Sequence, residues 1–193
     1  MKPVDIAFGP VPSRRLGQSL GINNILAKTC SYGCTYCQVG RTTCMTIQPS
    51  AFYDSASILA AVEKKIKQSQ ALGIHIDYAT FVSDGEPTLD IHLKQEIRGV
   101  KQLGCKTAVI SNASLIWRPE IQEALFQADW VSLKVDAVDL KTWRRINRPH
   151  GKLSLAKILD GALVFSKNYA GRLVTETMLV RDVNDGDENL QRV

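Results

Sequence analysis

The sequence has only three histidines and no long apolar run, and each shortage excludes a class of protein. No stretch of about 18 apolar residues occurs, so neither a membrane-spanning helix nor a membrane partner is predicted. The opening residues, MKPVDIAFGPVPSRR, lack the apolar centre of a secretory signal peptide. We therefore expect a cytoplasmic protein.

The shortage of histidine also argues against common zinc sites. His75, His92 and His150 are the only histidines, and none has the hook spacing of a zinc site. The chain has five cysteines, an odd number. In a reducing compartment such cysteines are more often ligands or buried thiols than disulfides.

Length and composition predict a single domain. The chain has 193 residues, of which 45% are hydrophobic, enough for one sizeable core and too short for two typical domains. We expect one domain over residues 1–193, with an N-terminal extension at 1–19 and no repeat or linker. The formal net charge of +5 is compatible with an acidic partner such as RNA but does not demonstrate one.

Strand-like and helix-like segments alternate along the chain. Apolar runs predict strands at 20–26, 77–83, 106–112, 130–136 and 172–180. Helical spacing and end signals predict helices at 54–71, from Asp90 to Gly104, at 119–127, after Asp139, after Ser154 and from near Asp185. Asp90, Asp139 and Ser154 are the expected N-caps of their helices. Such alternation predicts an α/β fold, either a doubly wound sheet or a partial parallel (β/α) barrel of the TIM-like type. In both, function lies at the carboxyl ends of the strands.

The end of the chain is unusual for this fold. The helix that begins near Asp185 is too short to cover much of a sheet. We therefore expect a barrel truncated after the fifth strand, with the last helix incomplete and at least one further strand missing.

Three cysteines lie close together in the stretch CSYGCTYC, at Cys30, Cys34 and Cys37. A [4Fe–4S] cluster is held by thiolates, and three of them leave one iron open to a substrate or cofactor. A zinc site remains an alternative, for which Cys44 would be the fourth ligand. Cys105 begins the third strand, at the far end, and is interpreted as a buried thiol.

The spacing Cys-x3-Cys-x-aromatic-Cys resembles the signature of the radical S-adenosylmethionine (radical SAM) enzymes. The resemblance implies that Cys30, Cys34 and Cys37 hold a [4Fe–4S] cluster and that SAM chelates its fourth iron. It also implies reductive cleavage of SAM to a 5′-deoxyadenosyl radical, which abstracts hydrogen from the substrate. Tyr36 would pack near the adenine. The electron would come from a donor such as flavodoxin or ferredoxin.

The stretch SDGEPT after the second strand is similar to the Gly-Gly-Glu-Pro motif of that family. Gly85, Glu86 and Pro87 match, whereas Asp84 replaces the first glycine. By the resemblance, Glu86 accepts a hydrogen bond from the SAM amino group. The alternative is an ordinary polar turn between a strand and a helix.

Polar residues near the ends of the third and fourth strands are further candidates. Ser111 and Asn112 could reach SAM, or they could serve only as turn residues. Lys134 could pair with the SAM carboxylate and Ser132 with its ribose, if the polar face of strand 130–136 lines the barrel lumen. The alternative is an internal ion pair between Lys134 and Asp136.

A basic stretch, KTWRRINRPHGK, follows the fourth strand at 141–152. Arginines beside Trp143 suit phosphate and base contacts, although a solvated helix face is the plainer interpretation. This stretch and FGPVPSRRLGQSLGIN at 8–23 resemble a radical SAM subgroup related to the tRNA wyosine-base enzymes. A tRNA substrate is therefore a hypothesis, beside a peptide or a small molecule. Two competing interpretations are a non-catalytic metal- or cluster-stabilised binding module and an inactive truncated remnant.

Overall fold

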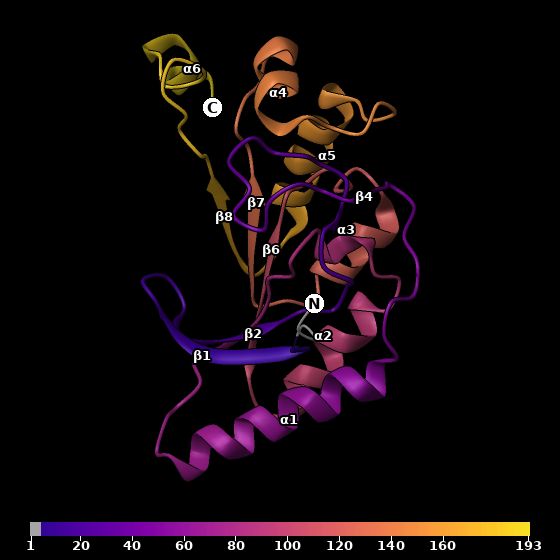
Figure 1. The fold of residues 1–193 in the computed structure, drawn as a ribbon, viewed down its shortest axis with the longest axis vertical. Coiled ribbons are helices and arrows are strands. Elements are labelled where there is room, and N and C mark those ends of the chain that lie inside the picture. Colours follow the sequence, from indigo (N-terminus) through magenta and orange to yellow (C-terminus); the bar gives the residue numbers. More distant parts are fainter. Residues whose placement is uncertain (1–4) are drawn as a thin grey trace.

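Six strands form the main sheet, in the order β1-β2-β5-β6-β7-β8. The structure is a computed structural model that describes residues 5–193. The sheet strands are β1 (Ala7–Ser13), β2 (Gly17–Ile22), β5 (Tyr78–Phe81), β6 (Lys106–Ser111), β7 (Trp130–Lys134) and β8 (Arg172–Glu176). A separate two-stranded sheet pairs β3 (Thr29–Cys30) with β4 (Cys44–Met45). Across the view of Figure 1 the strands turn from β1 and β2, which lie crosswise, to β7 and β8, which stand upright, so the sheet twists strongly.

The five predicted strands correspond to β2, β5, β6, β7 and β8, which pair in parallel in that order. The predicted α/β fold with a parallel sheet is confirmed. Several bounds were wrong, most of all in the first strand, which spans Gly17–Ile22 rather than 20–26, and in the last, which ends at Glu176 rather than at 180.

The N-terminal extension contains a strand that the sequence analysis did not predict. Strand β1 pairs antiparallel with β2 at the edge of the sheet, with an irregular register between Phe8 and Val11. Pro10 and Pro12 obscured it, because proline argues against a central strand yet is accepted at an edge. Residues 1–4 of the predicted extension lie outside the described residues.

The helices are α1 (Ser55–Ala71), α2 (Leu93–Gln102), α3 (Pro119–Leu125), α4 (Leu140–Asn147), α5 (Leu155–Asn168) and α6 (Asp187–Arg192), with a short 3-10 helix η1 (Pro87–Leu89). The predicted caps Asp139 and Ser154 each accept a backbone N–H of the helix that follows them. The cap predicted at Asp90 is wrong. Asp90 instead ends η1, and its carboxylate accepts the N–H of His92, so α2 begins only at Leu93. No helix within residues 5–193 has the length and apolar content needed to span a membrane.

The two faces of the sheet differ in what covers them. Val131 and Leu133 of β7 pack into the main core, which the helices cover. Trp130, from the other face, packs with Leu16 and Ala108 in a small separate cluster. The buried hydroxyls of Ser19 and Thr80 bond to each other at 2.8 Å. The predicted alternation along β7 is therefore confirmed, and its polar side faces away from the helices.

Candidate functional site

The cysteine loop packs against the turn that follows β5. The Lys28 N–H donates to the carbonyl of Asp84 at 2.6 Å, and the Glu86 N–H donates to the carbonyl of Thr29 at 3.1 Å. These two bonds join segments more than fifty residues apart in the chain, and they lie at the carboxyl end of the parallel strands. The structure therefore brings the CSYGCTYC and SDGEPT stretches together.

Gly85 is required by this close approach. A Cβ added there would lie 2.0 Å from the carbonyl oxygen of Thr29 and 2.8 Å from Cδ1 of Ile25. Both contacts are far shorter than van der Waals separation, and the first is with backbone that cannot rotate away. Only glycine permits the two stretches to pack at this distance.

The other side of the cysteine loop packs on the carboxyl end of α4. The Gly33 N–H lies 3.0 Å from the carbonyl of Asn147, and the Thr35 N–H donates to the carbonyl of Ile146 at 2.9 Å. The last carbonyls of a helix have no partner within it. Loop amides supply those partners here, so α4 and the loop position one another.

The three thiols differ in exposure and in their neighbours. Cys30 and Cys34 are half-buried, whereas Cys37 is exposed, and none forms a disulfide. The side-chain amide of Asn112 donates to Sγ of Cys30 at 3.4 Å, and that of Asn147 donates to Sγ of Cys34 at 3.5 Å. An open hollow of about 720 Å³ adjoins the loop, and it is lined by Gly33, Cys34, Thr35, Cys37, Gly40, Arg41, Thr42, Met45 and Arg148.

The half-buried thiols do not ionise readily. Burial raises the pKa of Cys30 to about 12, and the negative charge of Glu86 adds to the effect. Burial also raises the pKa of Cys34. Metal ligands must be thiolates, so metal binding here has to displace protons.

The donor set fits an iron–sulfur cluster better than a single zinc ion. Within residues 5–193, no three His, Cys, Asp or Glu side chains are gathered as the ligands of one ion would be. A four-iron cluster does not need its cysteine sulfurs to meet around one ion, because each cysteine binds a different iron. Amide donors to two sulfurs also suit thiolates that carry cluster charge.

Cys44 is poorly placed to complete the set. In the β3–β4 ladder it pairs with Thr29, whereas Cys30 pairs with Met45. Register partners share a face and successive residues alternate, so the side chains of Cys44 and Cys30 point to opposite sides. Cys105 lies elsewhere, half-buried against the main core, as expected of a thiol that is not a ligand.

Glu86 is almost completely buried, with 1% of its surface exposed. Oε1 accepts the Thr88 hydroxyl at 2.6 Å and the Ser111 hydroxyl at 2.8 Å, and Oε2 accepts the Asn112 N–H at 2.7 Å. Burial raises the pKa of Glu86, and these hydrogen bonds oppose that shift. Pro87 begins η1 directly after it, so the carboxylate is fixed in direction.

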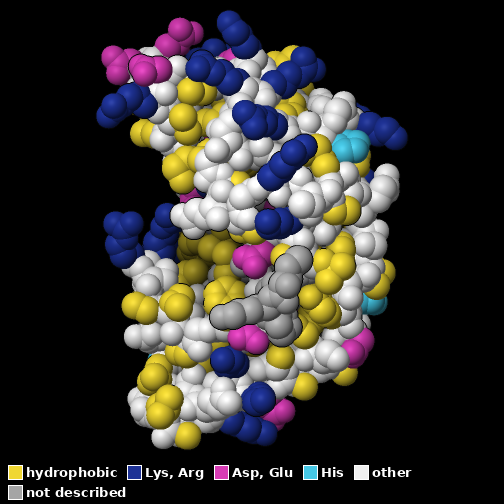
Figure 2. Space-filling view, viewed as in Figure 1, with side chains coloured by type: hydrophobic (Ala, Val, Ile, Leu, Met, Phe, Trp, Pro, Cys, Tyr) yellow, Lys and Arg dark blue, Asp and Glu magenta, His cyan; other side chains and the backbone are white. Residues whose placement is uncertain are grey.

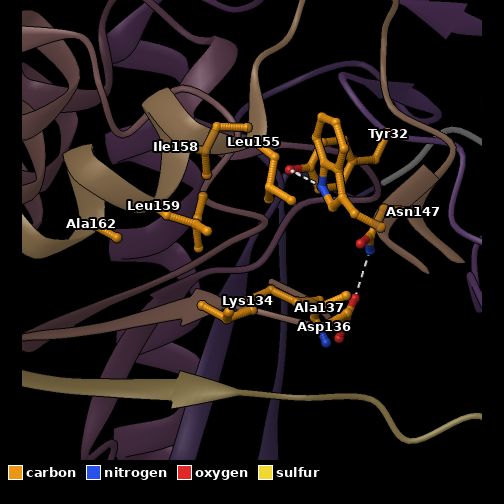
Figure 3. A pocket seen from close by; sticks show the side chains of 12 residues that line it. Tyr32, Lys134, Asp136, Ala137, Asn147, Leu155, Ile158, Leu159 and Ala162 are labelled. Carbon is orange, nitrogen blue, oxygen red and sulfur yellow. Dashed lines mark hydrogen bonds between the residues drawn. The ribbon is translucent and has the colours of Figure 1, made fainter. Parts of the chain in front are cut away.

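Tyr36 belongs to a buried network that the sequence analysis did not predict. Its hydroxyl donates to Asp136, which also accepts the Asn147 amide at 2.6 Å and the Met178 N–H at 2.8 Å. Figure 3 shows Asn147 turned toward Asp136 beneath Tyr32. Burial raises the pKa of Tyr36 far above its usual range. The network ties the cysteine loop to α4 and to the segments that follow β7 and β8.

The two candidates on β7 have different surroundings. The Ser132 hydroxyl donates to Glu176 at 2.7 Å, so contact with a ribose requires exchange of that bond. Nζ of Lys134 lies 5.4 Å from the centre of the Tyr36 ring. Among residues 5–193, no carboxylate forms an ion pair with Lys134, so the internal pair with Asp136 considered above is wrong.

The basic stretch at 141–152 divides between core and surface. Trp143 is 3% exposed and its indole N–H donates to Tyr32, so the idea that it offers a surface for bases is wrong. Helical spacing turns its ring inward while the arginines remain outside. Arg144, Arg148 and His150 line a second hollow of about 340 Å³. Figure 2 shows Lys and Arg side chains over this end of the molecule.

The family follows from comparison with known proteins. A family model described as the radical SAM superfamily matches residues 24–192. The chain belongs to the radical SAM superfamily. Its members use a [4Fe–4S] cluster and SAM, which agrees with the cofactors expected from the cysteine spacing.

Several relatives carry the description UPF0026 protein. That of Methanocaldococcus jannaschii is 51% identical over 185 residues, 96% of this chain and 57% of the relative. That of Helicobacter pylori strain 26695 is 38% identical over 191 residues, 97% of this chain and 60% of the relative. The chain thus spans less than two thirds of the length of either.

Solved structures of low sequence identity share the fold. A structure of TYW1 with a lysine–pyruvate adduct bound has a TM-score of 0.62 at 19% identity, covering 86% of this chain and 57% of that one. A radical SAM methyltransferase from Sphaerobacter thermophilus has a TM-score of 0.63 at 14% identity, covering 90% and 51%. The likeness supports the partial (β/α) barrel.

Proposed function

We propose that this chain is the core of a radical SAM enzyme, in which Cys30, Cys34 and Cys37 hold a [4Fe–4S] cluster. The observation that carries the proposal is the position of Asn112. Its backbone N–H binds Glu86 and its side-chain amide binds Cys30, so one residue links the proposed SAM site to the proposed cluster site. Three stretches that are far apart in sequence therefore converge on one place.

When bound, the reduced cluster supplies the electron that cleaves SAM to methionine and a 5′-deoxyadenosyl radical. The chain's own residues bind SAM and orient it. Oε2 of Glu86 accepts one hydrogen bond in the structure, and a carboxylate oxygen can accept a second, here from the SAM amino group. Gly85 and Pro87 hold that carboxylate in place. Lys134 offers its ammonium group to the SAM carboxylate.

Four further residues complete the proposed SAM site. The Tyr36 ring packs near the adenine, beside Lys134. Ser132 binds the ribose after exchange of its bond to Glu176. Ser111 and Asn112 contact SAM next to its amino group, since both already bind Glu86.

The test is an EPR spectrum of the anaerobically purified, iron- and sulfide-reconstituted chain after reduction, with and without SAM. We expect a [4Fe–4S]⁺ signal that changes when SAM is added, and no such signal in Cys34→Ala. Glu86→Gln should keep the cluster signal and weaken its response to SAM. A zinc-loaded protein, or a cluster indifferent to SAM, would contradict the proposal.

The substrate we propose is tRNA, supported by the basic residues around the cluster end. Arg41 and Arg148 line the hollow beside Cys37, and Arg144 lines the neighbouring one. Phosphate contacts make binding depend steeply on salt, so Arg148→Ala should weaken tRNA binding and reduce its salt dependence. Binding that does not respond to salt would favour a peptide or small-molecule substrate. Flavodoxin or ferredoxin is the electron donor we propose, in the cytoplasm.

A further inference from the structure

Two asparagines each donate a side-chain N–H to one of the cysteine sulfurs. Asn112, at the end of β6, reaches Cys30 at 3.4 Å, and Asn147, at the end of α4, reaches Cys34 at 3.5 Å. Both distances suit an N–H···S hydrogen bond. Within residues 5–193, no other side-chain amide donates to a cysteine.

The two amides share one arrangement. One proton of each binds an oxygen that orients the group, at 2.9 Å to the Ser31 hydroxyl for Asn112 and at 2.6 Å to Asp136 for Asn147. The remaining N–H of Asn112 is left for Cys30, whereas Nδ2 of Asn147 lies 3.5 Å from both Sγ of Cys34 and the hydroxyl of Tyr36. Because the bond to oxygen already orients each amide, its nitrogen stays close to sulfur without depending on the weaker N–H···S contact.

The direction of each amide is fixed by chemistry. Oδ1 of Asn112 accepts the Ser114 N–H at 2.9 Å, which places its nitrogen on the sulfur side. Asn147 faces the Asp136 carboxylate, which only accepts hydrogen bonds when ionised, so its nitrogen must face that way. Asn147 is 2% exposed, and water cannot easily replace it as a donor.

We infer that Asn112 and Asn147 are positioning residues that raise the reduction potential of the cluster. This inference rests on the proposed function. Reduction adds one electron, and the added negative charge spreads onto the sulfurs. An N–H directed at a sulfur stabilises that charge, so it favours the reduced cluster. Asn112 thereby serves the cluster as well as the proposed SAM site, and Asn147 gives the basic stretch at 141–152 a second role beside the cluster.

The test is to measure the midpoint potential of the cluster in the reconstituted Asn112→Leu and Asn147→Leu chains without SAM. EPR monitors the reduced cluster during the titration. Each variant should shift the oxidised-to-reduced ratio at fixed potential about tenfold toward the oxidised cluster, which is about 59 mV for one electron. The matched control is Asn184→Leu. Asn184 is also buried and binds the carbonyls of Asp136 and Met178, but its amide donates to no cysteine. Its potential should equal that of the wild type.

A second measurement needs no substitution. Asparagine carrying nitrogen-15 only in its side-chain amide should give a hyperfine coupling to the reduced cluster in pulsed EPR. No coupling, or unchanged potentials in the Asn112 and Asn147 variants, would overturn the inference. If the clusters of these variants still respond to SAM, the proposed function stands without this inference. A wild-type chain that holds no cluster overturns both.

Discussion

Replacing Gly85 by alanine should separate the two stretches that form the site. The new Cβ would lie 2.0 Å from the carbonyl oxygen of Thr29 and 2.8 Å from Ile25. Neither neighbour can move aside easily, because the Thr29 oxygen belongs to the backbone and Ile25 is fully buried. The turn at 83–88 must therefore move away from the cysteine loop.

The expected cost comes from two sources. Overpacking a tight site costs about 1–3 kcal/mol. The movement also weakens the Lys28–Asp84 and Glu86–Thr29 backbone bonds, each worth about 1 kcal/mol net. A total of about 3 kcal/mol corresponds to a fall in Tm of about 10 °C for a chain of this size.

Thermal unfolding followed by circular dichroism measures this loss, with Gly151→Ala as the matched control. A Cβ at Gly151 would meet no atom within 4 Å, and that variant should unfold close to the wild type. Iron retention after gel filtration is the second readout, because the displaced turn no longer supports the cysteine loop. A Gly85→Ala protein as stable as Gly151→Ala would refute the packing argument.

Three further predictions concern buried charge and the cysteine loop. Burial and the charge of Asp90 raise the pKa of fully buried Glu96 to about 9, so its contribution to stability is complete below pH 4.5 and is lost as the pH rises toward 9. In urea unfolding at equal iron loading, the stability of Glu96→Gln relative to the wild type should therefore increase by about 1.4 kcal/mol per pH unit between pH 5.5 and 7.5. A stability difference that does not change with pH would contradict this. Cys44→Ala should retain its iron while Cys37→Ala loses it, measured as iron per chain; equal losses would restore the four-ligand alternative. Tyr36→Phe removes a donor to the Asp136 carboxylate and should cost about 2 kcal/mol in thermal unfolding, whereas a neutral change would show that the network does not hold the loop.

Much of the fold followed from patterns that are local in the chain. Caps such as Asp139 and Ser154 and the alternation of Val131, Ser132 and Leu133 act within a few residues, so they were predicted correctly. Errors occurred where tertiary context overrides local preference. The edge of the sheet accepts two prolines in β1, and Asp90 ends η1 instead of capping α2, which begins at Leu93.

The sequence alone predicted the proposed cluster ligands and indicated the family, because cysteine spacing and the Gly85–Pro87 turn are short-range features. It did not show which side chains would surround those ligands. Asn112 is 82 residues from Cys30, and Asn147 is 113 residues from Cys34. Only the tertiary structure decided that their amides meet those sulfurs, because that contact depends on where β6 and α4 end relative to the loop. It also decided that Trp143 is buried and that Lys134 faces Tyr36, because the direction of a side chain depends on what packs around its element.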